Sequence, residues 1–396
     1  MKVKTIHPFP ARMAPDLALA VLEDMPQGSI ILDPMMGSGT VIRQALEYGH
    51  NAVGYDLDPL AVLMTRAWTT EVEDGAIATL LDDVLSRVAA LGQTIPTLEW
   101  QQDDETQSFL EYWFYDTQRQ DLARLAHVLA EIEASTLTPP LAAALSVLKV
   151  AFSRIIVTKE QAASLARDTS HSRPHRVATV SEYRVAPNFE RSVAQLRRRL
   201  EEHPPRGIAR TGRGDARALQ LDAESVDAVI TSPPYLNAID YMRGHRMSLV
   251  WLGHSIPSLR IVRSSSIGAE RAADVHTRQA EVLAVTVSMR GLEALDRRLE
   301  GIIGRYALDL IGMTAEIARV LRPNGKATFV VGNSCIKGKF INNTQGVATA
   351  SILAGMTVVA TRERDLPNAN RYLPVTGDSL SKRMRTETVL TCQKCG

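Results

Sequence analysis

An apolar stretch near the middle of the chain, Val226 to Thr231, runs directly into Ser232, Pro233, Pro234 and Tyr235. Proline has no backbone N–H, so the first proline ends the hydrogen-bonding ladder of a strand at once. A structural interpretation of this motif is a rigid strand exit. A chemical interpretation is a stiff turn that holds carbonyl oxygens and an aromatic ring where a flat, amine-bearing substrate must sit.

The chemistry that suits this motif is group transfer to the exocyclic amine of a nucleobase, whose lone pair is delocalised into the ring. Such a site needs acceptors for the amine protons, so that the lone pair can face the electrophile. Ser232 offers a hydroxyl and a carbonyl, and Pro233 offers a carbonyl. Pro234 fixes the geometry, and Tyr235 offers a face on which a flipped base can stack. The reaction needs no metal and no covalent nucleophile.

A second motif is a glycine-rich turn between an expected strand and an expected helix. The turn lets the backbone approach a ligand closely, and the helix N-terminus supplies N–H groups for a carboxylate or phosphate. Asp56 ends the next expected strand, where a carboxylate typically accepts hydrogen bonds from ribose hydroxyls. The alternative is a tight turn and a solvated aspartate. The turn consists of Asp33, Pro34, Met35, Met36, Gly37, Ser38, Gly39 and Thr40.

A third motif is the sequence from Gly214 to Arg217, which follows a later expected strand. The carboxylate of Asp215 could accept a hydrogen bond from an adenine amino group. A plain turn is an equally good interpretation of these four residues by themselves. Their position at a third strand end favours the ligand-binding interpretation.

The elements that must position these motifs alternate between strand and helix at the start of the chain. Residues 29–33 and 52–56 are expected strands, and residues 40–48 and 59–68 are expected helices. This βαβα order predicts a parallel sheet in an α/β fold. Later strands are expected at residues 208–211, 226–231, 327–331, 357–361 and 387–392, and the last two are expected to form a closing antiparallel hairpin.

The region between the second and third strands has little strand character. Leu122, Leu125, Leu129 and Ile132 recur at helical spacing, and the region is too long for a simple crossover. A second long segment without expected strands, at about residues 255–305, contains a serine run and several arginines. We therefore expect 1–73 as the first half of the core, 74–205 as a helical insertion that is a candidate target-recognition region, 206–254 as core with the proline motif, 255–305 as a lid-like insertion, and 306–396 as the rest of the core.

Composition sets broad limits on the type of protein. The 396 residues carry 45 basic and 44 acidic side chains, a net charge of +1, so no strong overall attraction to polyanions is expected. Acids nevertheless predominate from Glu71 to Glu133 and bases from Arg154 to Arg217, which favours either a nucleic-acid-facing surface or two solvated faces. Three cysteines fit a reducing compartment. With no leader-like or membrane-spanning apolar stretch, we expect a soluble cytoplasmic protein.

Taken together, the Asp33 to Thr40 turn, Asp56 and the Thr231 to Tyr235 motif resemble the S-adenosylmethionine-dependent DNA amino-methyltransferases, the N4-cytosine and N6-adenine group. The segment from His7 to Arg12 is similar to the one that precedes the glycine motif in that family and packs on the cofactor. The glycine motif comes first here, which departs from the permuted order common among Ser-Pro-Pro-Tyr members. The position of the target-recognition region is therefore left open.

The resemblance implies a Rossmann-like, seven-stranded methyltransferase sheet with a mainly helical insertion. It implies S-adenosylmethionine as cofactor and double-stranded DNA as partner, with a cognate restriction endonuclease as a further candidate partner. Serine in the first motif position more often accompanies cytosine N4 than adenine N6. The alternatives are an N6-adenine DNA enzyme, an RNA base methyltransferase and a non-catalytic DNA-binding subunit. By resemblance the cofactor-binding residues are His7, Phe9, Pro10, Asp33, Pro34, Gly37, Ser38, Gly39, Thr40, Asp56 and Asp215, and the catalytic residues are Ser232, Pro233, Pro234 and Tyr235.

Basic residues in two places are candidates for contacts with DNA phosphates. They are Arg197, Arg198 and Arg199 in the helical insertion, and Arg371, Lys382 and Arg383 between the last two expected strands. Solvated basic surfaces are the alternative in both places. Cys392 and Cys395 have the spacing of half a zinc site, but a tetrahedral site needs four ligands and no second pair is visible. We expect no metal.

Overall fold

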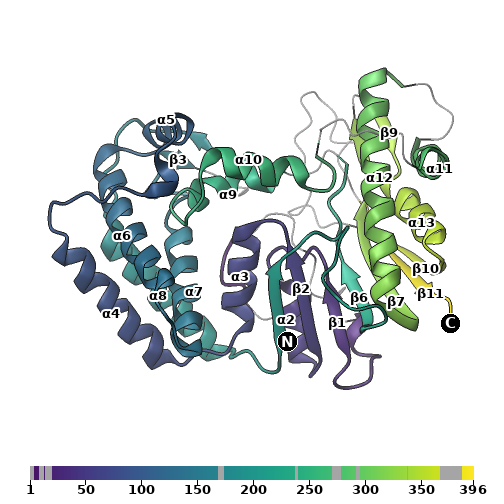
Figure 1. Ribbon diagram of the computed structural model, residues 1–396, viewed down its shortest axis with the longest axis horizontal. Coiled ribbons are helices and arrows are strands. Elements are labelled where there is room, and N and C mark those ends of the chain that lie inside the picture. The colour runs from purple at the N-terminus through teal and green to yellow at the C-terminus, as the bar shows by residue number, and fades with distance from the viewer. Residues whose placement is uncertain are drawn as a thin grey trace. The chain divides into compact units, whose positions relative to one another are not determined.

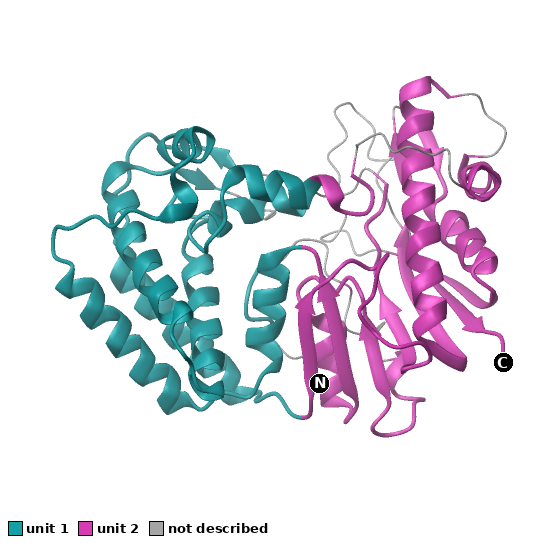
Figure 2. Ribbon diagram, viewed as in Figure 1, with its two compact units in different colours: residues 1–10, 58–206, 240–263 teal, residues 11–57, 207–239, 264–396 magenta. Residues whose placement is uncertain are grey.

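The computed structural model describes residues 4–8, 13, 20–167, 174–236, 240–269, 278–290, 295–336, 338–365 and 386–396. The chain divides into two compact units (Figure 2). The helical unit comprises residues 1–10, 58–206 and 240–263, and the sheet unit comprises residues 11–57, 207–239 and 264–396.

The sheet unit is built on one seven-stranded sheet within the described residues, with the order β10-β11-β7-β6-β1-β2-β5 (Figure 1). β1 pairs in parallel with β2 and β6, while β5 and β7 extend the parallel part on either side. β11 is antiparallel to both β7 and β10. The strands are β1 (Ile30–Asp33), β2 (Asn51–Asp56), β5 (Ala209–Arg213), β6 (Val226–Thr231), β7 (Leu321–Gly332), β10 (Met356–Asp365) and β11 (Thr386–Lys394).

The predicted Rossmann-like seven-stranded sheet is thus confirmed, including the closing antiparallel hairpin of β10 and β11. The central strands have the continuous apolar runs of strands that are buried on both faces. Ile31 and Leu32 of β1, and Val229 and Ile230 of β6, are fully buried. The carboxyl ends of β5, β2, β1 and β6 lie at the same edge of the sheet because these strands are parallel.

β7 is longer than the expected strand at residues 327–331 because it begins at Leu321. Pro323, Asn324 and Gly325 resemble a turn in sequence, and Asn324 does adopt a positive φ of 63°. The pairing of β6 with β7 shifts its register between Val226 and Ala228. The strand therefore continues through an irregularity that its sequence alone would place in a loop.

Helices and two short strands complete the sheet unit. α12 begins after Asp296, whose side chain accepts a hydrogen bond from Leu299 N at 2.9 Å. Its buried residues Ile303, Leu310 and Ile317 belong to the same core cluster as Phe329 of β7. The elements are α2 (Thr40–Glu47), α11 (Gln279–Arg290), α12 (Arg297–Val320), α13 (Asn343–Leu353), β8 (Ser334–Ile336) and β9 (Lys339–Ile341).

The helical unit has α7 at its centre, which contacts α3, α4, α6, α8 and α9. Leu148 and Phe152 of α7 are fully buried, and Phe152 meets Phe189 of α8 edge to face. The elements are α3 (Pro59–Thr69), α4 (Asp74–Ala90), η1 (Glu99–Gln101), α5 (Asp104–Trp113), α6 (Asp116–Ala134), α7 (Pro139–Arg154), β3 (Ala166–Arg167), β4 (His175–Arg176), α8 (Val185–Glu202), α9 (Tyr241–Leu249) and α10 (Ile256–Ser265), the last two residues of which belong to the sheet unit.

The compact units and the expected boundaries divide the chain differently. Residues 58–73 and 240–254, expected to be core, group with the helical unit. The expected lid-like region 255–305 contains α10, α11 and the first part of α12. None of the helices among the described residues is long and apolar enough to cross a membrane.

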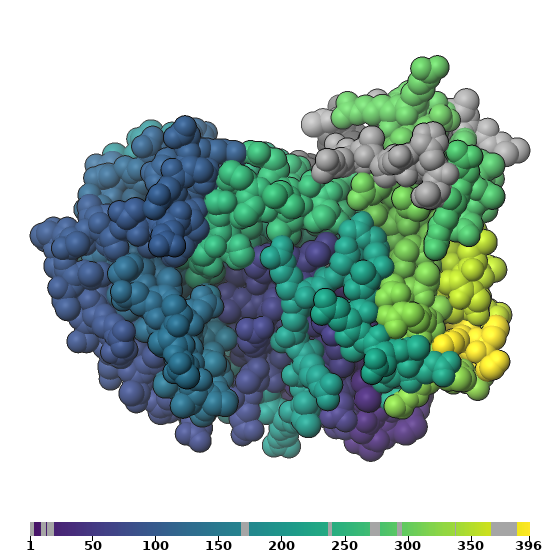
Figure 3. Space-filling view, viewed as in Figure 1, coloured from purple at the N-terminus to yellow at the C-terminus, as the bar shows by residue number. Residues whose placement is uncertain are grey.

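The two cysteines near the end of the chain have different surroundings. Cys392 in β11 is fully buried, whereas Cys395 is exposed and its Sγ lies 3.7 Å from Thr357 Oγ1. The end of the chain is visible at the surface in the space-filling view (Figure 3). In the described part of the chain, no group of three or more His, Cys, Asp or Glu side chains could hold a metal ion.

Candidate functional site

A buried carboxylate marks the carboxyl end of β1. Asp33 is 3% exposed and accepts hydrogen bonds from Thr231 Oγ1 at 2.7 Å and from Met35 N at 3.2 Å. Thr231 is the last residue of β6, so this bond joins the start of the glycine turn to the start of the Ser-Pro-Pro-Tyr turn. Burial raises the pKa of Asp33 to about 7, although the Thr231 hydroxyl acts in the opposite direction.

The raised pKa gives a prediction about stability. Because the folded state holds the Asp33 proton up to about pH 7 and the unfolded chain loses it near pH 4, folding binds a proton between these values. The free energy of unfolding should therefore fall by about 1.4 kcal/mol per pH unit across this window through Asp33 alone. In Asp33→Asn this fall should disappear, while the amide oxygen still accepts from Thr231.

Urea unfolding of both proteins at several pH values between 4 and 8 measures the difference. Asp222→Asn in an exposed loop is the matched control, and its profile should follow that of the original protein. Parallel profiles for the original protein and Asp33→Asn would mean that Asp33 is ionised throughout.

The glycine turn between β1 and α2 requires a backbone that other residues rarely adopt. Gly37 and Gly39 have φ values of 48° and 80°, in the left-handed region that favours glycine. Gly39 is the N-cap residue of α2, and no side chain among the described residues caps this helix. Thr40 is the first helical residue and is buried. The backbone N–H groups of the first turn are therefore the donors that this helix end presents.

Asp56 lies at the carboxyl end of β2, beside the glycine turn. Its Oδ2 accepts a hydrogen bond from Gly37 N at 2.9 Å. The backbone carbonyl of Asp56 also accepts from Gly214 N at 3.1 Å, which brings the turn after β5 to the same edge. Two of the sequence-predicted cofactor residues, Gly37 and Asp56, are thus in direct contact.

Asp215 is held by Arg217, two residues further along. Its Oδ1 accepts from Arg217 N at 2.9 Å, and its two oxygens accept from Arg217 Nε at 2.9 Å and Nη2 at 2.7 Å. Burial would raise the pKa of Asp215, but the hydrogen bonds and charge of Arg217 outweigh it and lower that pKa. Asp215 is therefore an ionised, oriented carboxylate just beyond the carboxyl end of β5.

The Ser-Pro-Pro-Tyr turn follows β6 and is bonded on both sides. Ser232 Oγ donates to the carbonyl of Val330 in β7 at 2.9 Å. The carbonyl of Pro234 accepts from Tyr306 Oη at 2.9 Å. Since the proton of the Ser232 hydroxyl is directed at Val330, the lone pairs of its oxygen are available for a donor on another side. A hydroxyl that presents lone pairs and not its proton is what an acceptor of amine protons needs.

The ring of Tyr235 is half-buried and packs against the core of the sheet unit. Burial raises its pKa to about 12, and the charge of Glu387 acts in the same direction. The Ser232 side chain and the backbone of Gly332 act on this pKa in the opposite direction. Protein groups therefore surround the Tyr235 ring. Base stacking by Tyr235 stays a prediction.

Apart from the arginines of α8, the remaining sequence-predicted residues are His7, three turn residues and five residues outside the described part of the chain. His7 belongs to the helical unit, where its Nε2 lies 3.0 Å from Ser153 Oγ. Pro34, Ser38 and Pro233 belong to the two turns already described. Phe9, Pro10, Arg371, Lys382 and Arg383 lie outside the described residues.

The three arginines of α8 differ in their surroundings. Arg197 makes a two-pronged ion pair with Asp74, at 2.6 Å for both Nε–Oδ1 and Nη2–Oδ2. Arg199 donates to the carbonyl of Thr5, whereas Arg198 is exposed. Arg198 is thus the residue of this group that faces solvent most openly.

Several residues at the site were not anticipated from the sequence. Tyr306, Asp309 and Arg305 lie on α12, and Arg364 and Glu387 lie on β10 and β11. Arg364 Nε lies 2.5 Å from Glu387 Oε1. Asp309 is the charged residue among the buried side chains of α12, and a charge within such a helical pattern is the signal that could have predicted a buried partner.

Comparison with known proteins gives similarity over part of the chain. The chain is 34% identical over 82 residues, 20% of its length, to the type II methyltransferase M.MvaI of Kocuria varians. It is 30% identical over 94 residues, 24% of its length, to the type II methyltransferase M.MjaII of Methanocaldococcus jannaschii. The resemblance to DNA methyltransferases is confirmed. The chain spans 18% of the length of each of these two relatives, and no protein-family model matches it.

Solved structures with a related arrangement are distant. A SAM-dependent methyltransferase of Methanosarcina mazei has 8% identity and a TM-score of 0.34, with 95% of this chain and 97% of that one covered. A candidate DNA modification methylase of Thermus thermophilus, complexed with S-adenosyl-L-methionine, has 17% identity and a TM-score of 0.25, with 46% and 52% covered. At such scores the fold assignment rests on the sheet order of this chain itself.

Proposed function

We propose that this chain transfers a methyl group from S-adenosylmethionine to the exocyclic N4 of a cytosine in DNA, acting directly on a base flipped out of the duplex. One observation carries the proposal. The glycine turn and the Ser-Pro-Pro-Tyr turn follow the neighbouring parallel strands β1 and β6, and the Thr231–Asp33 hydrogen bond joins them. The partial similarity to two type II methyltransferases supports the methyltransferase part of the proposal.

The groups at the strand ends fit S-adenosylmethionine as a ligand. Gly37 and Gly39 permit close approach to the backbone, and the first turn of α2 presents N–H groups. Asp56 would accept hydrogen bonds from the ribose hydroxyls, and Asp215 from the adenine amino group. Bound there, S-adenosylmethionine would supply an electrophilic methyl group.

The acceptor side of the site acts on the amine. The Ser232 hydroxyl donates to Val330 and so offers its lone pairs to an amine proton, and the Pro233 carbonyl would accept the second proton. With both protons held, the amine lone pair is turned out of conjugation with the base, which raises its nucleophilicity. The amine nitrogen would bond to the methyl carbon as the methyl–sulfur bond of the cofactor breaks, and the resulting cationic amine would lose a proton to solvent. No general base within the protein is therefore required before transfer.

Cytosine N4 is favoured over adenine N6 by the serine in the first position of the motif, through the family resemblance. The same acceptors would serve either amine, so this choice does not affect the mechanism. An RNA base is the rival substrate class.

Exposed arginines of α8 are proposed to contact DNA phosphates. Arg198→Ala should weaken DNA binding and should reduce the slope of log affinity against log salt by about 0.9, the contribution of one neutralised phosphate. Arg197→Ala is the matched control, because Arg197 is paired with Asp74 and should change the slope less. Fluorescence anisotropy with a duplex at several salt concentrations measures both. Equal slopes for Arg198→Ala and the original protein would exclude this part of α8 as the contact.

Uptake of labelled methyl groups tests the proposed function. The purified protein is incubated with S-adenosylmethionine labelled in its methyl group and with genomic duplex DNA or total RNA. The proposal expects label in DNA. Label in RNA alone would overturn the substrate class, and cofactor binding without transfer to either would favour a non-catalytic subunit.

A further inference from the structure

Two side chains of α12, one helical turn apart, hold the two halves of the site: the Ser-Pro-Pro-Tyr turn and the cofactor-side carboxylate of Asp215. Tyr306 is 0% exposed and donates from its Oη to the carbonyl of Pro234 at 2.9 Å. Asp309 is 3% exposed and accepts from Arg217 Nη1 at 2.5 Å. Pro234 belongs to the acceptor turn, and Arg217 holds Asp215 on the cofactor side. One rigid helix therefore connects both halves.

Tyr306 is suited to fix the acceptor turn. Burial raises the pKa of its phenol, so the hydroxyl stays a neutral donor at any physiological pH. Its hydrogen bond fixes the orientation of the peptide between Pro234 and Tyr235, because a carbonyl with a directed donor cannot rotate freely. Gly268 packs alongside, since a Cβ at this residue would lie 3.5 Å from Tyr235 O and 3.7 Å from the Tyr306 ring.

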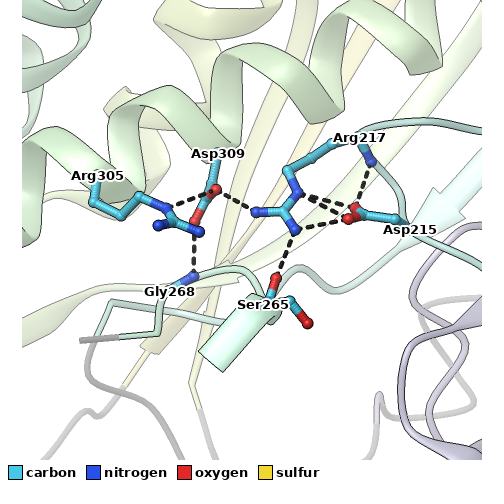
Figure 4. Close-up of polar contacts among 6 residues, drawn as sticks. All are labelled: Asp215, Arg217, Ser265, Gly268, Arg305 and Asp309. Carbon is cyan, nitrogen blue, oxygen red and sulfur yellow. Dashed lines mark hydrogen bonds and ion pairs between the residues drawn. The ribbon is translucent and has the colours of Figure 1, made fainter. Parts of the chain in front are cut away.

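Arg217 bridges two carboxylates that are distant in sequence (Figure 4). Its Nε and Nη2 bind Asp215 in the fork geometry that guanidinium groups favour, and its Nη1 binds Asp309. Nη2 also donates to the carbonyl of Ser265 at 2.5 Å. The planar guanidinium thus fixes the position of Asp215 relative to α12.

The charges of this cluster balance. Arg305 Nε lies 3.2 Å from Asp309 Oδ1, and Gly268 N donates to Asp309 Oδ2 at 3.3 Å. Two carboxylates, Asp215 and Asp309, therefore face two guanidinium groups, Arg217 and Arg305 (Figure 4). Removing one charge from a partly buried, paired cluster leaves another uncompensated, so the geometry of the remaining groups should change.

We propose that Tyr306 and Asp309 are positioning residues for methyl transfer: Tyr306 sets the acceptor turn through Pro234, and Asp309 sets the adenine-binding carboxylate of Asp215 through Arg217. This inference rests on the proposed function. It assigns separate kinetic roles to two residues of one helix. Neither residue touches the reacting atoms.

The test compares Tyr306→Phe, Asp309→Asn and a control in the same helix. Tyr306→Phe should lower the rate at saturating cofactor and DNA by roughly three- to tenfold, the effect of one lost neutral hydrogen bond, with unchanged cofactor Kd. Asp309→Asn should raise the cofactor Kd by roughly tenfold, with a smaller change in the saturated rate. Calorimetry with S-adenosylmethionine and single-turnover methylation give these two quantities.

Thr314→Val is the control for a merely structural effect. Thr314 Oγ1 is buried on α12 and donates to the carbonyls of Leu310 and Ala350, away from both turns. This variant should lower the melting temperature without changing the rate or the Kd of the folded protein. If Asp309→Asn does not fold, the double variant Arg305→Gln with Asp309→Asn restores the charge balance and should still show the raised Kd.

The outcomes separate this inference from the proposed function. An original protein that binds no S-adenosylmethionine and transfers no methyl group overturns both. An active original protein, with Tyr306→Phe and the Asp309 variants unchanged in rate and Kd, overturns only the positioning roles. The same is true if both variants lower stability alone, as Thr314→Val is expected to do.

Discussion

Ser232→Ala should lower the rate of methyl transfer by about 10- to 100-fold, because it removes an acceptor that acts as positive charge develops on the amine. The size follows from the roughly 1.5–3 kcal/mol of a hydrogen bond to a charged group, converted at tenfold per 1.4 kcal/mol. DNA affinity should hardly change, since this interaction is felt mainly in the transition state. Single-turnover rates and DNA anisotropy measure the two effects separately.

Ser225→Ala is the matched control for Ser232→Ala. Ser225 precedes the same strand, β6, at its opposite end, and its Oγ donates to the carbonyl of Asp222. This variant should keep the original rate. Full activity of a folded Ser232→Ala protein would show that Ser232 does not hold the amine.

Asp56→Ala should weaken S-adenosylmethionine binding by about 1.5–3 kcal/mol, the range for a hydrogen bond made by a charged group. The carboxylate has two tasks, because it holds Gly37 N at 2.9 Å and would hold the ribose. Asp56→Asn keeps an oxygen for Gly37 but loses the charge, so it should fall between alanine and the original protein. Isothermal titration calorimetry gives the affinities.

Asp222→Ala, in an exposed loop before β6, serves as the control and should bind normally. Unchanged affinity in folded Asp56→Ala would remove Asp56 from the cofactor site. Weakened binding in Asp56→Ala with normal binding in Asp56→Asn would assign the effect to the Gly37 contact and not to the charge.

The fold was predictable where local pattern and tertiary structure agree. The short apolar runs that became β1, β2 and β6 are largely buried. A proline follows β1 directly, and another follows β6 after one intervening residue. Because these strands are parallel, motifs far apart in sequence had to meet at their carboxyl ends. That rule places Asp33 and Thr231 at the same edge, and the pairing of β1 with β6 in the structure brings them to an Oγ1–Oδ1 distance of 2.7 Å.

The buried ion pairs were not predictable in the same way. Arg217 and Asp309 are 92 residues apart in sequence, and the spacing of Tyr306 with Ile303 and Leu310 is typical of an ordinary core face. Sequence pattern shows that a helix has an apolar face but does not show which distant charge a residue on it will meet. Arg197 is a similar case, since its pairing with Asp74 depends on how α4 and α8 pack.

The orientation of the Tyr235 ring also depends on tertiary structure. The two prolines fix the backbone before it, but the surroundings of the ring come from β7 and β11, which supply Gly332 and Glu387. Local sequence could predict the rigid turn and its acceptors. It could not predict that the phenol would be held by protein groups.

The most direct test of the account is the chemical identity of the product. Duplex DNA is methylated by the purified protein, digested to nucleosides and analysed by mass spectrometry against authentic standards. N4-methylcytosine is the expected product, and N6-methyladenine would keep the mechanism while changing the base. The appearance of 5-methylcytosine, formed at a ring carbon and not at an amine, would contradict the mechanism itself.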